Sequence, residues 1–302
     1  MPADDSMMTR MFKGAGFITA LDQSGGSTPG ALRQYGIPPE AYSGDAEMFR
    51  LMHEMRVRIM TAPAFTGEKV IGAILFEATM DGTVRQTPVP EFLWRERRIV
   101  PFLKVDKGLA EDSGGVRLMK PMPGLDALLD RAVRLGIFGT KMRSVISLPS
   151  AEGIAALVQQ QFDVAATIIG KGLVPIVEPE ALIDSPARAE VEAILLRELH
   201  KHLDALPSGQ KVMLKLSIPE TTDLYAPLVA HDRVGRVLAL SGGFSRSEAC
   251  KRLALNHGMI ASFSRALTQD LTHQMSDGEF NAALATSIDE IYVASTQKHG
   301  AA

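Results

Sequence analysis

The chain has 302 residues, of which 46% are hydrophobic and 22% charged, and its formal net charge at pH 7 is −3. These proportions are typical of a folded protein, and a chain of this length buries enough apolar surface to need no metal or disulfide for stability. The negative charge argues against a nucleic-acid-binding protein, and no apolar run approaches the roughly 18 residues of a membrane-spanning helix. Cys250 is the single cysteine, so no intrachain disulfide can form, and the acidic start of the chain lacks the pattern of a secretory signal. We therefore expect a cytoplasmic location.

Short apolar runs, each followed by turn residues and then by a longer amphipathic segment, recur along the chain. Most of these runs are apolar nearly throughout, which is typical of parallel strands covered on both faces. The predicted strands are 16–22, 70–78, 100–106, 139–146, 174–180, 212–218, 237–241 and 259–264.

The segments between the runs predict helices. Apolar residues at three- and four-residue spacing indicate helices over 151–169 and 186–206, and Ser245 followed by Glu248 has the spacing of a capping box for a helix over 245–256. A last helix is predicted over about 277–297. The polar segment 81–98 predicts a long loop with a short helix.

Eight buried strands alternating with helices indicate the α/β class and a single (β/α)8 barrel, with residues 1–302 forming one domain that its C-terminal helix completes. The alternative is a doubly wound open sheet. Such a sheet usually has fewer strands and a G-x-G-x-x-G motif after the first, whereas residues 22–29 read DQSGGSTP.

Charged residues stand near the carboxyl ends of the predicted strands, where a barrel places its active site. Lys104, Lys141, Glu178 and Lys215 follow one another at intervals of 37 residues, about the length of one β/α unit. We expect these four side chains at equivalent heights on consecutive strands. Charges within apolar strands are expensive to bury, so they are either partners in internal ion pairs or parts of an active site.

Three neighbouring lysines suggest a chemical purpose. Nearby positive charge and desolvation both lower the pKa of an ammonium group, and a neutral lysine amine forms a Schiff base with a carbonyl substrate. Lys215 is the best candidate because its strand is otherwise apolar, and Glu178 on the neighbouring strand is placed to shuttle protons.

Two glycine-rich turns are candidate phosphate sites. Ser241 and Gly242 precede a predicted helix start, whose backbone N–H groups favour an anion, and Arg265 follows the last strand. Ser24 and Ser27 follow Asp22 directly. Either turn taken alone is equally well explained as a tight turn or a helix cap. The histidines form no pattern expected for a catalytic metal, so we expect no metal site.

In this order, the motifs GFITALDQSGGSTPGAL, PFLKVDKGL, GTKMRSVI, GLVPIVEPE, VMLKLSIPE, ALSGGFSRSEA and ASFSRAL resemble those of the class I fructose-1,6-bisphosphate aldolases, in particular the shorter bacterial form. They run from about residue 14 to about residue 270. The resemblance implies a metal-independent carbon–carbon lyase without a cofactor. It also implies reversible cleavage of fructose 1,6-bisphosphate to dihydroxyacetone phosphate and glyceraldehyde 3-phosphate in glycolysis and gluconeogenesis, and a homo-oligomer.

The resemblance also implies roles for individual residues. Lys215 matches the Schiff-base lysine, Glu178 the acid/base of carbinolamine chemistry, and Asp22 the base for the C4 hydroxyl. Glu180 supports Glu178. The implied substrate contacts are Lys141 and Arg143 for the hydroxyls, Ser241, Gly242 and Arg265 for the C1 phosphate, and Lys104, Ser24 and Ser27 for the C6 phosphate.

Two departures from the longer animal-type members stand out. Gln23 takes the place of an acid that follows the aspartate of the first strand, and Tyr292 is the last tyrosine, whereas the longer members carry a terminal tyrosine that assists proton transfer. The acid that protonates the enamine is therefore unassigned. Three alternatives stay open: a Schiff-base aldolase for a different aldehyde or a single phosphate, a barrel that only binds, and a metal-dependent aldolase.

Overall fold

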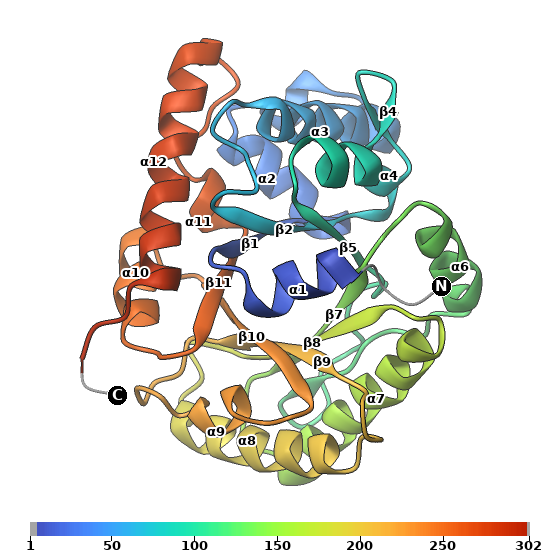
Figure 1. The fold of residues 1–302 in the computed structure, drawn as a ribbon, viewed down its shortest axis with the longest axis vertical. Helices are drawn as coiled ribbons and strands as arrows, with labels where there is room; N and C mark the ends of the chain where they lie inside the picture. The colour runs from blue at the N-terminus through green and yellow to red at the C-terminus, as the bar shows by residue number, and fades with distance from the viewer. Residues whose placement is uncertain (1–4, 301–302) are drawn as a thin grey trace.

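Eight parallel strands close into a barrel in this computed structural model, which describes residues 5–300 (Figure 1). The order of the strands around the barrel follows the chain, and the pairings of β5 with β7 and of β1 with β11 complete the ring. The predicted (β/α)8 fold is thereby confirmed. The barrel strands are β1 (Phe17–Leu21), β2 (Val70–Leu75), β5 (Val100–Lys104), β7 (Gly139–Ile146), β8 (Val174–Ala181), β9 (Val212–Ser217), β10 (Val234–Leu240) and β11 (Met259–Phe263).

Helices surround the barrel and pack on its outer face (Figure 1). No helix within residues 5–300 is long and apolar enough to cross a membrane. The longer helices are α2 (Thr28–Gln34), α3 (Gly44–Thr61), α6 (Leu125–Arg134), α7 (Ala151–Gly170), α8 (Arg188–Asp204), α10 (Arg246–Ala254) and α12 (Asp277–Thr296). The short ones are α4 (Glu77–Met80), α5 (Val89–Glu91), α9 (Ala226–Val229), α11 (Arg265–Thr268), the 3-10 turns η1 (Gly25–Ser27) and η2 (Pro39–Ala41), and the π-type turn η3 (Phe92–Glu96).

The inside of the barrel is apolar near the amino ends of the strands, which we call its lower part; the upper part is the half near their carboxyl ends. Side chains from seven of the barrel strands, together with Phe138 just before β7, form one cluster there, and helix α1 (Asp5–Lys13) covers the amino ends of the strands with Met7 and Met11. Figure 1 shows α1 lying across this end of the ring. Arg236 at the start of β10 donates to the carbonyl oxygens of Met11 (3.2 Å) and Gly14 (3.0 Å), which fixes α1 in place. Among residues 5–300, α1 thus covers the amino end of the barrel, whereas the charged side chains of the strands lie at the carboxyl end.

Most predicted boundaries agree with the structure to within two residues, and three predictions need correction. The strand predicted over 70–78 ends at Leu75, because Glu77 begins α4, and the strand predicted over 237–241 begins at Val234. The segment 81–98 is more ordered than expected. It folds into the hairpin β3 (Thr83–Val84) and β4 (Thr87–Pro88), then α5 and η3, and it buries apolar side chains that were not recognised within a polar stretch.

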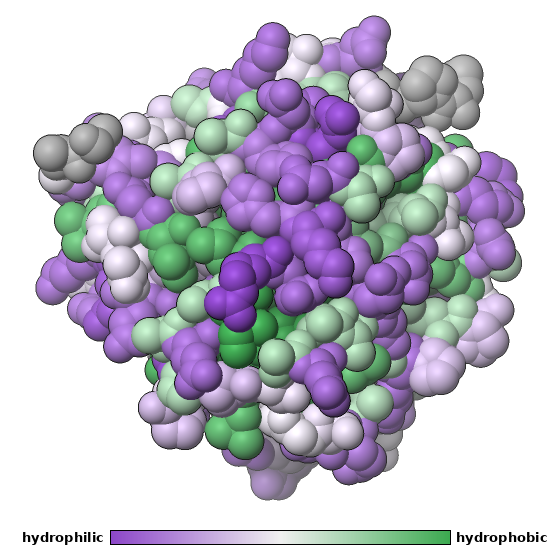
Figure 2. Space-filling view, turned by 90° about the horizontal axis from the view of Figure 1, so that it is seen from below, coloured by the Kyte–Doolittle hydropathy of each residue, from purple (hydrophilic) through white to green (hydrophobic). Residues whose placement is uncertain are grey.

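Helix starts follow the capping prediction in part. Ser245 caps α10 by accepting from the Glu248 backbone, but the Glu248 carboxylate turns to Arg252 (2.6 Å) instead of completing a capping box. The complete box is at Ser276 and Glu279, where α12 begins. Seen from the side of α8, the surface is mostly polar, with smaller apolar areas between the polar ones (Figure 2).

Candidate active site

Four side chains of opposite charge lie in a row at the carboxyl end of the barrel. Lys141 Nζ is 2.6 Å from Asp22 Oδ2 and 3.0 Å from Glu178 Oε2, and Lys215 Nζ is 2.9 Å from Glu178 Oε1. At most 9% of each side chain is exposed. Acid and base therefore alternate from Asp22 to Lys215 in a largely buried row.

The charges of this row determine the protonation of its central members. Burial by itself raises the pKa of Asp22, but the neighbouring ammonium groups, that of Lys141 first, outweigh burial and hold this pKa well below its usual range. Burial by itself lowers the pKa of Lys141, but the carboxylates of Asp22 and Glu178 outweigh it and raise this pKa. Lys141 is therefore not the lysine that loses its proton easily. It stays cationic and Asp22 stays ionised at neutral pH.

The spacing of 37 residues predicted that the charged side chains stand at the same height on neighbouring strands, and the strand register agrees with this only in part. Lys104 pairs directly with Lys141 across β5 and β7, as expected. Lys141 pairs with Ile176, however, and Glu178 pairs with Arg143, so Glu178 lies two residues further along β8 than equivalence requires. A step of two keeps both side chains on the inner face, and such stagger between strands is how a barrel closes. The expected equivalence is wrong for Lys141 and Glu178, although the two side chains still meet.

A second group of charges lies beside the row. Lys104 Nζ donates to the carboxylate (2.7 Å) and the backbone carbonyl (2.8 Å) of Asp106, and Asp106 also accepts from the backbone N–H of Arg143 (3.3 Å). The Arg143 guanidinium is ion-paired with Glu180, which raises the pKa of Arg143 despite the opposing effect of burial. Lys104 and Arg143 are thus each held by a carboxylate at the edge of the site.

The loop after β10 has the conformation expected of an anion-binding turn. Gly242 has a φ of +60°, and a Cβ built on it would lie 2.7 Å from Ile183 Cγ2, so only glycine fits there. Ser241 is 9% exposed, and Phe244 N donates to its carbonyl oxygen (2.9 Å). Arg265, the first residue of α11, is exposed, and its side chain makes no ion pair or hydrogen bond with the other residues of 5–300. This cation is free to meet a ligand.

The other predicted phosphate turn closes on itself. Ser27 Oγ donates to the Ser24 carbonyl (2.9 Å), and Ser24 N donates to Ser27 Oγ (3.0 Å). Strand β2 lies between β1, which carries this turn, and β5, which carries Lys104. The structure records no contact that joins the turn to Lys104 in the part of the chain that it describes.

Sequence reasoning missed two polar residues near the site. Arg56 on α3 is 2% exposed and donates to the Gln23 carbonyl oxygen (2.5 Å), next to Asp22. Ser262 on β11 pairs in register with the inward-facing Ile18, and its buried hydroxyl has no hydrogen-bond partner among the described residues. Ser262 stands two residues after the inward-facing Ile260 on the same strand, and this alternation could have identified it as an inward-facing residue. Arg56 could not be found in this way, because it lies on a helix.

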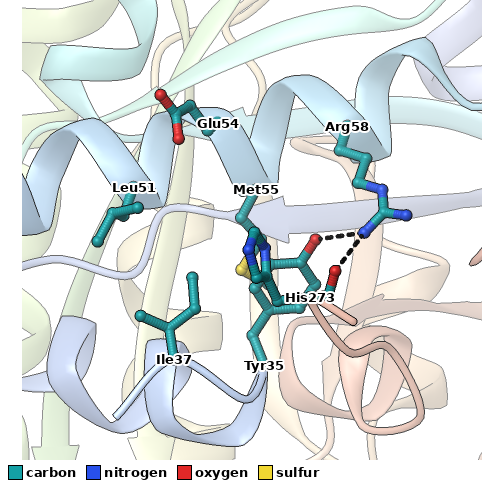
Figure 3. A pocket seen from close by; sticks show the side chains of 7 residues that line it. All are labelled: Tyr35, Ile37, Leu51, Glu54, Met55, Arg58 and His273. Carbon is teal, nitrogen blue, oxygen red and sulfur yellow. Dashed lines mark hydrogen bonds between the residues drawn. The ribbon is translucent and has the colours of Figure 1, made fainter. Parts of the chain in front are cut away.

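Two surface cavities flank these elements. One, of about 580 Å³, lies next to the loop after β10 and is lined by Ile183, Phe244 and Arg252 among others. The other, of about 260 Å³, lies between α2, α3 and the segment after α11 (Figure 3). None of the predicted site residues lines it. Within residues 5–300, no group of three or more His, Cys, Asp or Glu side chains is arranged to hold a metal ion.

Comparison with known proteins places this geometry in context. The family model for fructose-bisphosphate aldolase class-I matches residues 11–214. A fructose-bisphosphate aldolase class 1 from Synechocystis sp. is 55% identical, over 97% of this chain and 97% of that protein. One from Clostridium acetobutylicum is 52% identical, over 97% and 99%. The solved structure of fructose-bisphosphate aldolase from Plasmodium falciparum, in complex with TRAP and an inhibitor, has the same fold, with a TM-score of 0.77 at 22% identity over 98% of this chain and 96% of that one.

Proposed function

Because the chain belongs to the class I fructose-bisphosphate aldolase family, we propose that it cleaves fructose 1,6-bisphosphate reversibly into dihydroxyacetone phosphate and glyceraldehyde 3-phosphate. The resemblance read from the motifs is confirmed by these comparisons. The proposed reaction runs through a Schiff base on Lys215 and needs neither metal nor cofactor.

The observation that carries this proposal is the contact of Lys215 Nζ with Glu178 Oε1 at 2.9 Å. Lys141 keeps its proton, and Lys104 is held by Asp106. Lys215, in contrast, contacts the proposed acid/base Glu178, so it is the lysine best placed to act as the nucleophile. Glu178 accepts a proton from Lys215, and the neutral amine attacks the C2 ketone. A proton passes from the attacking nitrogen to the C2 oxygen, and Glu178 then returns its proton to the resulting hydroxyl of the carbinolamine, which leaves as water while the C=N bond of the iminium forms.

Cleavage follows at the other end of the row. Asp22 is ionised and takes the proton of the C4 hydroxyl while the C3–C4 electron pair moves to the iminium on Lys215. The iminium is the electron sink, so Asp22 need not be a strong base. Lys141 lies between the two reacting groups, and its fixed charge stabilises negative charge that develops on the substrate oxygens.

The two phosphates are assigned to opposite sides of this row. Backbone N–H groups at Ser241 and Gly242 and the free guanidinium of Arg265 suit the C1 phosphate. We assign the C6 phosphate to Lys104 together with the turn of Ser24 and Ser27, which must leave their present partners to bind it. Arg143 and Glu180 are assigned to the substrate hydroxyls and to the support of Glu178.

We also propose that residues 1–302 form a single domain, and that the enzyme acts in the cytoplasm as a homo-oligomer. The closed ring of strands supports the first proposal. The single cysteine supports the second, because proteins of oxidising compartments commonly carry disulfides.

The test of this function is borohydride trapping with dihydroxyacetone phosphate in the presence of a chelator, read by intact mass and peptide mapping. We expect one stable adduct on Lys215. If no adduct forms and the chelator abolishes cleavage, the enzyme is a metal-dependent aldolase and the lysines are structural.

A further inference from the structure

Arg56 is a buried cation without a carboxylate partner. Its side chain lies under α3, 2% exposed, and it has no ion pair with any residue of 5–300. It donates to Thr79 Oγ1 (2.7 Å), to the Gln23 carbonyl oxygen (2.5 Å) and, more weakly, to Gln23 Oε1 (3.4 Å). Burial of a guanidinium without a counterion costs free energy of folding, which suggests that Arg56 has a functional role.

Gln23 extends the contact to a third loop. Its Nε2 donates to Ser264 Oγ at 2.6 Å, directly before Arg265. Gln23 follows β1, Thr79 follows β2 and Ser264 follows β11, and these three strands are neighbours in the barrel. Arg56, Gln23, Thr79 and Ser264, which we call the clasp, therefore join the carboxyl ends of three adjacent strands.

The clasp begins one residue after Asp22. The Asp22 carboxylate has a single ion-pair partner among the described residues, Lys141, and the turn that follows it is bonded only to itself at Ser24 and Ser27. The peptide between these points is fixed by Arg56 through the Gln23 carbonyl. Burial lowers the pKa of Arg56 to about 10, and the nearby Asp22 charge acts in the opposite direction, so the guanidinium keeps its charge at neutral pH.

We propose that Arg56 is a positioning residue for Asp22, which it holds against Lys141 by fixing the Gln23 peptide. This inference rests on the proposed role of Asp22 as the base of carbon–carbon cleavage. Arg56 touches neither Lys215 nor Glu178, so its loss affects cleavage and leaves Schiff-base formation intact.

The test compares Arg56→Met and Arg56→Lys with the unchanged enzyme in two assays: cleavage of fructose 1,6-bisphosphate and borohydride trapping of dihydroxyacetone phosphate on Lys215. We expect Arg56→Met to lower kcat for cleavage about 30-fold with KM changed by less than about 3-fold, because small misplacements of catalytic groups cost up to about 100-fold. The trapped adduct stays stoichiometric. Arg56→Lys keeps the charge but replaces the two nitrogens that contact Thr79 and Gln23 by one, and we expect a smaller loss in kcat.

Arg58→Met is the matched control. Arg58 lies on the same helix and also holds a loop, by donating to the Tyr35 hydroxyl (3.1 Å) and the His273 carbonyl (3.2 Å) at the second cavity (Figure 3). It has no contact with the clasp, so the ratio of cleavage to trapping stays at the unchanged value even if stability falls. Thr79→Val removes the other anchor of the Arg56 guanidinium, so if Arg56→Met does not fold, Thr79→Val decides the question alone, with a smaller fall in the ratio of cleavage to trapping expected.

Equal losses of cleavage and trapping in the Arg56 or Thr79 variants, or no loss in either assay, would overturn the positioning role. Failure of the unchanged enzyme to form the Lys215 adduct is a different result, because it rejects the proposed function itself.

Discussion

The lower and upper parts of the barrel interior differ sharply although the same strands build both. Phe102, Ile176 and Met213 are fully buried in the apolar cluster above α1, and two residues further along their strands stand Lys104, Glu178 and Lys215. Side chains two residues apart on a strand point to the same face, so on each of these three strands a core side chain is followed on the inner face by a charged side chain of the site.

This difference shows how the fold holds expensive charges in place. The apolar part is closed at the amino end by Met7 and Met11 and contains an edge-to-face contact of Phe102 with Phe138 at 5.4 Å. The charged part is just as buried, but each of its charges meets an opposite one. The packed apolar cluster of the lower part fixes the positions of the strands, and the ion pairs of the upper part stabilise the buried charges that the proposed reaction needs.

The substitution Lys215→Met should have the largest effect, because it changes the charged upper part of the barrel interior and leaves the apolar lower part intact. We expect cleavage to fall by about 10⁴-fold or more, because the covalent route is lost, while the protein still folds around the unchanged apolar cluster. Steady-state kinetics and borohydride trapping measure this. Lys201→Met, an exposed lysine of α8, is the control and leaves both readouts unchanged. A Lys215→Met enzyme that still forms an adduct would place the nucleophile elsewhere.

Lys104→Met tests the assignment of the C6 phosphate. A charge-assisted contact contributes about 1.5–3 kcal/mol, so turnover of fructose 1,6-bisphosphate should fall on the order of 10- to 100-fold relative to that of fructose 1-phosphate. The measurement is kcat/KM for both substrates. Equal losses on the two substrates would reject this role and favour an aldolase for a singly phosphorylated substrate.

Met11→Ala probes the lower part alone. Met11 is fully buried in α1, and truncation of a buried methionine lowers the free energy of unfolding by about 2–5 kcal/mol. Urea unfolding measures the loss. We expect kcat of the folded enzyme to change less than about 2-fold. A large fall in kcat with intact folding would mean that the two parts are coupled more tightly than their geometry indicates.

The smallest expected effect is the pH dependence of the unfolding free energy that the buried ion pair of Asp22 and Lys141 contributes. The pKa of Asp22 is lowered in the folded state, so its contribution to stability is complete above the unfolded value of about 3.9 and is lost as the pH falls through the folded value. The pKa of Lys141 is raised, so its contribution is complete below about 10.4 and is lost only at higher pH. The difference in unfolding free energy between the unchanged enzyme and Asp22→Asn should therefore stay constant from about pH 5 to 9 and shrink below about pH 4. A difference that varies near neutral pH would contradict this assignment of charges.

Much of the site was predictable because a barrel strand constrains its residues strongly. The apolar runs indicated eight strands, and the charged residues at their ends indicated which side chains gather at the carboxyl end of the barrel, where Asp22, Lys141, Glu178 and Lys215 do lie in contact. The segment 81–98 was not predictable in the same way, since its polar residues mask the apolar side chains that it buries.

The sequence by itself therefore determined the order of the strands, the family, and the set of charged residues at the carboxyl end of the barrel, because strand periodicity and motif order are local properties of the chain. Only the tertiary structure decided which charges pair. The two-residue step between Lys141 and Glu178 and the turn of Lys104 toward Asp106 depend on strand stagger, which no single strand encodes. The placement of Arg56 beside Gln23 depends on how α3 packs over β1 and β2, and this packing joins residues 33 positions apart in the chain.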